Sequence, residues 1–226
     1  RIRADSELVM INATVLDRKD HIVTDLRPEQ VSVLEDGVPQ RIRTFALEDV
    51  PVSLAIVLDL SGSMRGAYAK VQEALSQFST GLNSDDEYTV ITFRAQPTVQ
   101  VPFTSDPARL ESLVMAEEPK GSTALIDSLV MALNELKAGR NKRKAVVILS
   151  DCGERSSRYT WSELLSMVRE AGIPIYAFML RAFRGDHFDY YEMEHIVEES
   201  GGRFVDVGKA RNFPDKLNRL EIHQQY

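Results

Sequence analysis

Several patterns that mark common functional classes are missing from this 226-residue chain. A single cysteine excludes a disulfide within the chain, and the four histidines are dispersed, without the spacing of zinc ligands. Acidic residues outnumber basic ones by 34 to 27, and the resulting net charge of −7 argues against a nucleic-acid binder. No apolar run is long enough to cross a bilayer.

Motifs for the best-known enzyme classes are absent as well. The chain has no Gly-x-x-x-x-Gly-Lys-Ser/Thr phosphate loop, no Gly-x-Ser-x-Gly elbow and no His-Glu-x-x-His sequence. What it does have is an apolar content of 43% with 27% charged residues, which is typical of a globular protein with a substantial core.

The first fifty residues have the pattern of a small antiparallel β module. Short β-like runs alternate with turn signals, of which Asp36-Gly37 is the strongest, and no helical period appears. The expected strands cover residues 8–16, 21–24, 31–34 and 41–47. Four strands are few for a closed sandwich. We therefore expect residues 1–50 to form a sandwich-like module that is incomplete by itself.

Residues 51–226 alternate between strand-like and helix-like segments. The expected strands cover residues 52–59, 88–93, 98–103, 144–150, 173–180 and 203–207. The expected helices cover residues 66–82, 107–115, 123–136, 160–171, 188–199 and 214–226, and Thr160 with Glu163 forms a capping box. Such alternation predicts an α/β fold, a doubly wound and mostly parallel sheet flanked by helices.

Oxygen-bearing side chains stand where three of these segments meet loops. Asp59, Ser61 and Ser63 directly follow the first apolar strand, Asp151 follows the strand at 144–150, and Thr123 precedes a helix. In a parallel sheet these positions share one edge, beyond the carboxyl ends of the strands. Two carboxylates and three hydroxyls suit a hard divalent cation that keeps some of its waters. The alternative is that the serines cap a helix and the aspartates accept from local backbone amides.

With these residues, the part of the chain from about residue 51 to 220 resembles a von Willebrand factor type A domain. Asp59-Leu60-Ser61-Gly62-Ser63-Met64, Thr123 and Asp151 match the metal-ion-dependent adhesion site of that family. The resemblance implies a Rossmann-like fold, a bound Mg²⁺ or Mn²⁺ ion, and a protein ligand that supplies an Asp or Glu carboxylate to the metal. Cys152 and Arg155 depart from the family pattern, in which glycine and a small polar residue are more common.

The β module adds a second resemblance. It is similar to the segment that precedes this domain in the bacterial "VWFA-related" family described from acidobacteria, including Leu34-Glu35-Asp36-Gly37-Val38-Pro39-Gln40. The resemblance implies a secreted or cell-envelope protein. It also leads us to expect that the native chain continues beyond Tyr226 into strands that complete the module.

Arginine and aromatic residues, which dominate binding hot spots, gather in the two loops expected beside the metal site. The candidate rim residues are Arg155, Arg158, Tyr159, Trp161, Phe183 and Arg184, and Arg181, Phe188 and Tyr190 are further residues of these types. The alternative for Trp161 and Phe188 is packing against their own helices.

The leading functional hypothesis is a non-enzymatic, cation-dependent protein-binding module. Its rivals are a Mg²⁺-dependent hydrolase or phosphotransferase on the same kind of sheet, and a structural scaffold with a vestigial metal site. No histidine or lysine has an evident position as a general base, which favours the binding module.

Overall fold

The computed structural model describes residues 15, 23, 26–45, 48–49, 51–80, 82–180, 187–207 and 224–225. The chain divides into two compact units, one of Arg1–Val50 with Glu221–Tyr226 and one of Pro51–Leu220. Residues 221–226 are thus grouped with the first unit, whereas the sequence analysis placed them in the α/β domain. No helix in the described ranges is both long and apolar enough to span a membrane.

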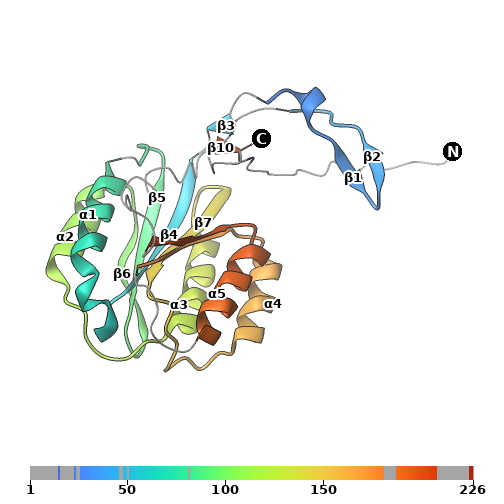
Figure 1. Ribbon diagram of the computed structural model, residues 1–226. Helices are drawn as coiled ribbons and strands as arrows, with labels where there is room; N and C mark the ends of the chain where they lie inside the picture. Colours follow the sequence, from blue (N-terminus) through green and yellow to red (C-terminus); the bar gives the residue numbers. More distant parts are fainter. Residues whose placement is uncertain are drawn as a thin grey trace. The chain divides into compact units, whose positions relative to one another are not determined.

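The second unit is built on a six-stranded sheet with the order β6-β5-β4-β7-β8-β9 (Figure 1). Its strands are β4 (Val52–Asp59), β5 (Glu87–Phe93), β6 (Pro97–Thr104), β7 (Arg143–Ser150), β8 (Ile175–Met179) and β9 (Arg203–Asp206). All neighbours are parallel except β6, which runs antiparallel to β5 at one edge. The expected doubly wound, mostly parallel sheet is confirmed.

Helices cover both faces of this sheet. In chain order they are α1 (Tyr68–Ser79), α2 (Pro107–Ala116), α3 (Leu125–Glu135), α4 (Trp161–Ala171) and α5 (His187–Glu199). Figure 1 shows α1 and α2 on one side of the sheet and α3, α4 and α5 on the other. Every residue of β4 and β5 is buried, because successive side chains of a strand point to opposite faces and both faces are covered.

Most segment boundaries agree with the sequence to within a few residues, and the differences have local causes. The helix expected from residue 66 is preceded by a short 3₁₀ helix, η2 (Gly62–Gly66), and α1 begins only at Tyr68. The capping box of Thr160 and Glu163 is present at the start of α4, and Gly172 ends that helix in the left-handed conformation, with φ 59°.

The first unit contains a hairpin of β1 (Val33–Glu35) and β2 (Val38–Gln40). Its turn residues Asp36 and Gly37 have φ of 48° and 80°, the geometry that the Asp-Gly signal predicts for a two-residue hairpin loop. A short 3₁₀ helix, η1 (Pro28–Gln30), precedes the hairpin.

Other expectations for the first unit are corrected or lie outside the described residues. Residues 41–45 form no strand, although 41–47 alternate as a strand would. The strands expected at 8–16 and 21–24 are described only at Val15 and Val23, where the Val23 amide donates to the Val15 carbonyl at 2.8 Å. The helix expected to the chain end is wrong at Gln224–Gln225, which form strand β10 and pair with β3 (Glu48–Asp49).

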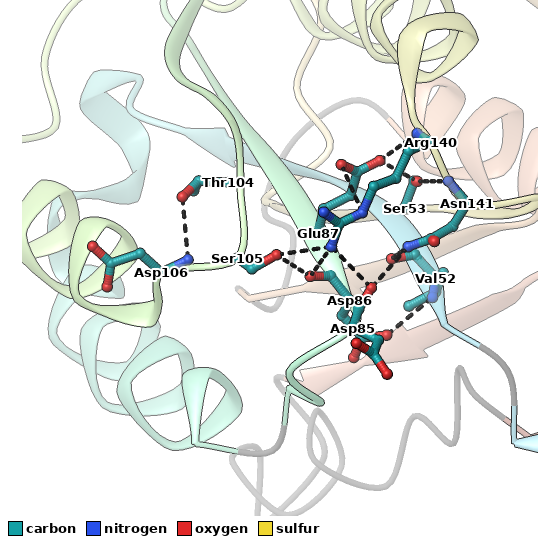
Figure 2. A network of polar contacts seen from close by, with 10 residues as sticks. All are labelled: Val52, Ser53, Asp85, Asp86, Glu87, Thr104, Ser105, Asp106, Arg140 and Asn141. Carbon is teal, nitrogen blue, oxygen red and sulfur yellow. Dashed lines mark hydrogen bonds and ion pairs between the residues drawn. The ribbon is translucent and has the colours of Figure 1, made fainter.

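A network of polar contacts fixes the amino-terminal ends of the central strands (Figure 2). The buried Asp86 accepts from the Val52 amide at 2.9 Å, and the Asn141 side chain donates to the Val52 carbonyl at 3.0 Å. Glu87 accepts from the Ser53 hydroxyl at 2.6 Å and from the Arg140 amide. Because these contacts hold β4, β5 and the loop before β7 in register, they also set which residues reach the opposite edge.

Candidate metal centre

The candidate ligands lie at the carboxyl edge of the sheet, at the place where the strand order reverses. From β4 the chain crosses to β5 on one side, and later returns as β7 on the other side of β4. Asp59 is the last residue of β4, and Asp151 directly follows β7. Leu58 and Leu149 are register partners of these two parallel strands, so the two carboxylates leave the sheet next to each other.

The loop after β4 is organised by its own side chains. One carboxylate oxygen of Asp59 accepts from the Ser61 amide at 2.8 Å, and the Ser150 hydroxyl donates to the other at 2.6 Å. The hydroxyls of Ser61 and Ser63 lie 3.0 Å apart. Asp59 and Ser61 are buried and Ser63 is exposed, so the group extends from the core toward solvent.

Backbone hydrogen bonds bring the Thr123 segment to the same place. The Gly62 amide donates to the Gly121 carbonyl at 3.1 Å, and the Lys120 amide to the Leu60 carbonyl at 2.8 Å. From the other side, the amides of Arg155 and Ser156 both donate to the Thr123 carbonyl, at 3.0 and 2.9 Å. Thr123 therefore lies between the loop that carries the serines and the loop that follows Asp151.

The electrostatics of Asp59 follow from this crowding. Burial and the nearby Asp151 carboxylate raise the pKa of Asp59 from 3.8 to about 6, while the hydrogen bonds from Ser150 and Ser61 lower it in part. A divalent cation between two such carboxylates would offset both the desolvation and the mutual repulsion.

The donor set fits such a cation, because Mg²⁺ and Mn²⁺ prefer oxygen ligands. Among the described residues no three His, Cys, Asp or Glu side chains cluster as a metal site would require. This candidate centre relies on hydroxyls for its remaining ligands.

The alternative for these residues was that the serines cap a helix and the aspartates accept from local backbone amides, and the structure supports only part of it. Asp59 does accept from a local amide, that of Ser61. Ser61 is the N-cap residue of η2, yet its side chain makes no capping hydrogen bond. Helix capping therefore does not account for the Ser61 hydroxyl.

The structure sorts the candidate rim residues into three kinds. Arg155 is exposed. Arg158 has a side chain that is 84% exposed, but its Nε donates to the buried Asp127 carboxylate at 3.1 Å. Tyr159 and Trp161 are partly buried and pack against the hydrophobic core, as the alternative for Trp161 anticipated.

The remaining rim candidates give little further support. Phe183 and Arg184 lie outside the described residues, as do Arg181 and the side chain of Phe188. Tyr190 packs edge-on against Phe204, with ring centroids 5.0 Å apart.

Three residues that organise the site were missed by sequence reasoning. Ser150 donates to Asp59, while Glu154 and Asp127 join the loop after β7 to the start of α3. Glu154 stands three residues after the candidate ligand Asp151, and that position was the available signal.

With the geometry described, comparisons with known proteins can be added. Residues 54–154 match the family model of the von Willebrand factor type A domain. The structure of a von Willebrand factor type A protein from Catenulispora acidiphila superimposes with a TM-score of 0.61 at 17% identity, covering 76% of this chain and 41% of that one. The second unit is thus similar to a von Willebrand factor type A (VWA) domain, in sequence over residues 54–154 and in fold.

Two further structures share the fold of this VWA-like domain. Proximal thread matrix protein 1 from the mussel byssus, solved with a zinc-occupied MIDAS motif, gives a TM-score of 0.64 at 18% identity, covering 80% of this chain and 49% of that one. The pilus adhesin SpaC from Lactobacillus rhamnosus GG gives 0.59 at 16% identity, covering 76% and 30%. At such identities the likeness concerns the fold alone. A search among curated proteins finds no match.

Cys152 stands at a position where the VWA resemblance led us to expect glycine. Its φ of 62° lies in the left-handed region, where glycine is favoured, and this explains the family preference. The thiol is buried in the core cluster. Burial and the surrounding carboxylates, Asp151 foremost, raise the pKa of Cys152 well above its usual value, so it has no character of a reactive thiolate.

Proposed function

We propose that this VWA-like domain is a divalent-cation-dependent protein-binding module and not an enzyme. Mg²⁺ or Mn²⁺ would be held by Asp59, Ser61, Ser63, Thr123 and Asp151, directly or through water. The observation that carries the proposal is the junction of three oxygen-bearing segments at the reversal point of the sheet. The three hydroxyl ligands are neutral and do not add to the negative charge around the cation, so a partner's Asp or Glu carboxylate could replace a bound water.

The comparisons with known proteins support the proposal of a cation-dependent binding module. The mussel protein carries a zinc-occupied MIDAS motif, and the pilus protein is an adhesin. By analogy, this chain would act outside the cytoplasm, in the cell envelope or beyond it. Arg155 and the guanidinium of Arg158 would provide a cationic border for an acidic partner segment.

Calorimetric titration with Mg²⁺ and Mn²⁺ tests the proposal. The wild-type chain should bind one cation, and Asp59→Ala should lose the binding because it removes a central carboxylate ligand. Glu163→Ala is a matched control, since that exposed carboxylate caps α4 and should leave cation binding unchanged. A wild-type chain that releases no heat with either cation would exclude the module, and metal-dependent turnover of a phosphate ester would favour the enzymatic rival.

A further inference from the structure

Helix α3, which begins just after the candidate ligand Thr123, has no capping group of its own. Its N-cap residue is Ala124, which makes no side-chain capping hydrogen bond. The first amides of a helix have no partner within the helix and need one elsewhere. For this helix the amides of Ile126 and Asp127 find partners in a distant part of the sequence.

The loop after β7 supplies those partners. Glu154 Oε2 accepts from the Ile126 amide at 2.9 Å, and the Ser157 hydroxyl accepts from the Asp127 amide at 3.0 Å. The same hydroxyl donates to Glu154 Oε2 at 2.7 Å. A carboxylate at this end of a helix is also favoured by the helix dipole. The start of α3 is therefore capped by the loop after β7, from residues that lie 28 and 30 positions further along the chain.

Glu154 also holds its own loop in shape. Its Oε1 accepts from the amides of Ser156 and Ser157, at 2.8 and 2.9 Å. The two oxygens thus receive four hydrogen bonds from two segments. Such a saturated carboxylate is suited to orienting its neighbours, and less to serving as a ligand itself.

Asp127 makes the reciprocal connection from the helix to the loop. Its buried carboxylate accepts from the amides of Arg158 and Tyr159, at 2.9 and 3.2 Å, and from Arg158 Nε. A further contact joins the hydroxyls of Ser122 and Ser156, 2.5 Å apart. With the two amides that donate to the Thr123 carbonyl, these contacts join the segments that carry Thr123 and Asp151.

We propose that Glu154 is a positioning residue that holds Thr123 and Asp151 in one rigid arrangement for the cation. This inference rests on the proposed metal-binding function and adds to it a residue that is not a ligand. Thr123 sits one residue before the N-cap of α3, and Asp151 sits three residues before Glu154. Loss of the Glu154 carboxylate would free both ligand segments at once and lower cation affinity.

The variant Glu154→Gln tests the proposal, with Glu87→Gln as its matched control. Gln keeps the size of Glu, but its amide nitrogen cannot accept the hydrogen bonds made to one of the two oxygens. Glu87 is also a carboxylate that accepts from several donors, but it lies at the opposite edge of the sheet (Figure 2). Both variants should lower the resistance to urea, and only Glu154→Gln should also weaken Mg²⁺ binding, by roughly 10-fold, as is typical when support for a metal ligand is lost.

A second variant, Ser157→Ala, keeps the test decisive if Glu154→Gln does not fold. It removes one hydroxyl that connects Glu154 with Asp127 and should weaken Mg²⁺ binding in the same direction by a smaller factor. Calorimetry gives the Mg²⁺ affinity, and urea unfolding in EDTA gives stability independently of the metal.

The outcomes separate this inference from the function on which it rests. If the wild type binds no Mg²⁺, both fail. If the wild type binds Mg²⁺ and Asp59→Ala does not, while Glu154→Gln and Ser157→Ala match the wild type, only the positioning role fails. An equal loss of affinity in Glu87→Gln would also overturn it, because the effect would then reflect general destabilisation.

Discussion

At the scale of single residues, the ionised carboxylate of Asp59 destabilises the fold when no cation is bound. It is 1% exposed and lies near Asp151, so its ionised form is disfavoured despite the hydrogen bonds from Ser61 and Ser150. At neutral pH its charge opposes folding. A cation would remove that cost, so binding of the metal and stability of the fold are coupled.

The pH dependence of stability tests this account. Since the pKa of Asp59 is raised to about 6 from 3.8 in the folded chain, the native state binds more protons than the unfolded one between these values. The free energy of unfolding should therefore fall as pH rises through this window and stay lower above it. From pH 4.5 to 7.5 in EDTA, urea unfolding should show an additional fall of about 2 kcal/mol in the wild type relative to Asp59→Asn. Parallel pH profiles for the two proteins would contradict the assignment.

At the scale of elements, the turn between α5 and β9 requires glycine for two different reasons, the backbone conformation at Gly201 and the lack of space at Gly202. Gly201 has φ 74°, as expected of a helix end. Gly202 has an ordinary φ, but a Cβ added there would lie 1.9 Å from the Ile175 carbonyl oxygen at the start of β8. The Ser200 hydroxyl meanwhile accepts from the Ile175 amide at 2.9 Å. The turn packs backbone against backbone, which leaves no space for a side chain.

Replacing this glycine should therefore destabilise the whole domain. Gly202→Ala forces β8 and the turn apart and should lower the free energy of unfolding by about 3 kcal/mol or more. Gly66→Ala is the control, since a Cβ there meets nothing within 4 Å. Urea unfolding of both variants measures the effect. Equal stabilities would show that the turn can move away from Ile175 at little cost.

At the scale of the whole molecule, the net charge of −7 opposes the approach of an acidic partner. Attraction has to come from local features, the proposed cation and the exposed arginines beside it. Arg155 is a better probe of this border than Arg158, because a reversed charge at Arg158 would face the buried carboxylate of Asp127 and disturb the loop itself.

Proteins retained from a cell-envelope extract on the immobilised chain provide a test at this scale. Those released by EDTA are the expected partners, and Asp59→Ala should retain none of them. Arg155→Glu should weaken their retention by roughly 5-fold, the size of effect expected for one exposed charge, without changing Mg²⁺ affinity. If EDTA and Arg155→Glu both leave the amount of retained protein unchanged, that result would count against a docking surface centred on the cation.

The order of strands and helices followed from the sequence because its causes are local. An apolar run such as residues 52–58 stays buried in any parallel arrangement, Thr160 and Glu163 cap their own helix, and Asp36-Gly37 forms its own turn. Position after a strand was also enough to indicate Asp59 and Asp151 as neighbours, since parallel strands end at one edge.

Other features were decided only by the tertiary structure, because their partners are distant in sequence. Trp161 has the residue type of a binding hot spot, yet it packs on the core. Asp127 is buried under the loop after β7, and no sequence pattern singled it out. The strand at Gln224–Gln225 replaced an expected helix because its partner, Glu48–Asp49, lies at the other end of the chain. The sequence by itself determined which oxygen-bearing side chains follow the central strands and are therefore the candidates for binding a cation. The packing of remote segments decided which residues hold them in place, since burial and hydrogen bonding depend on neighbours that no local pattern records.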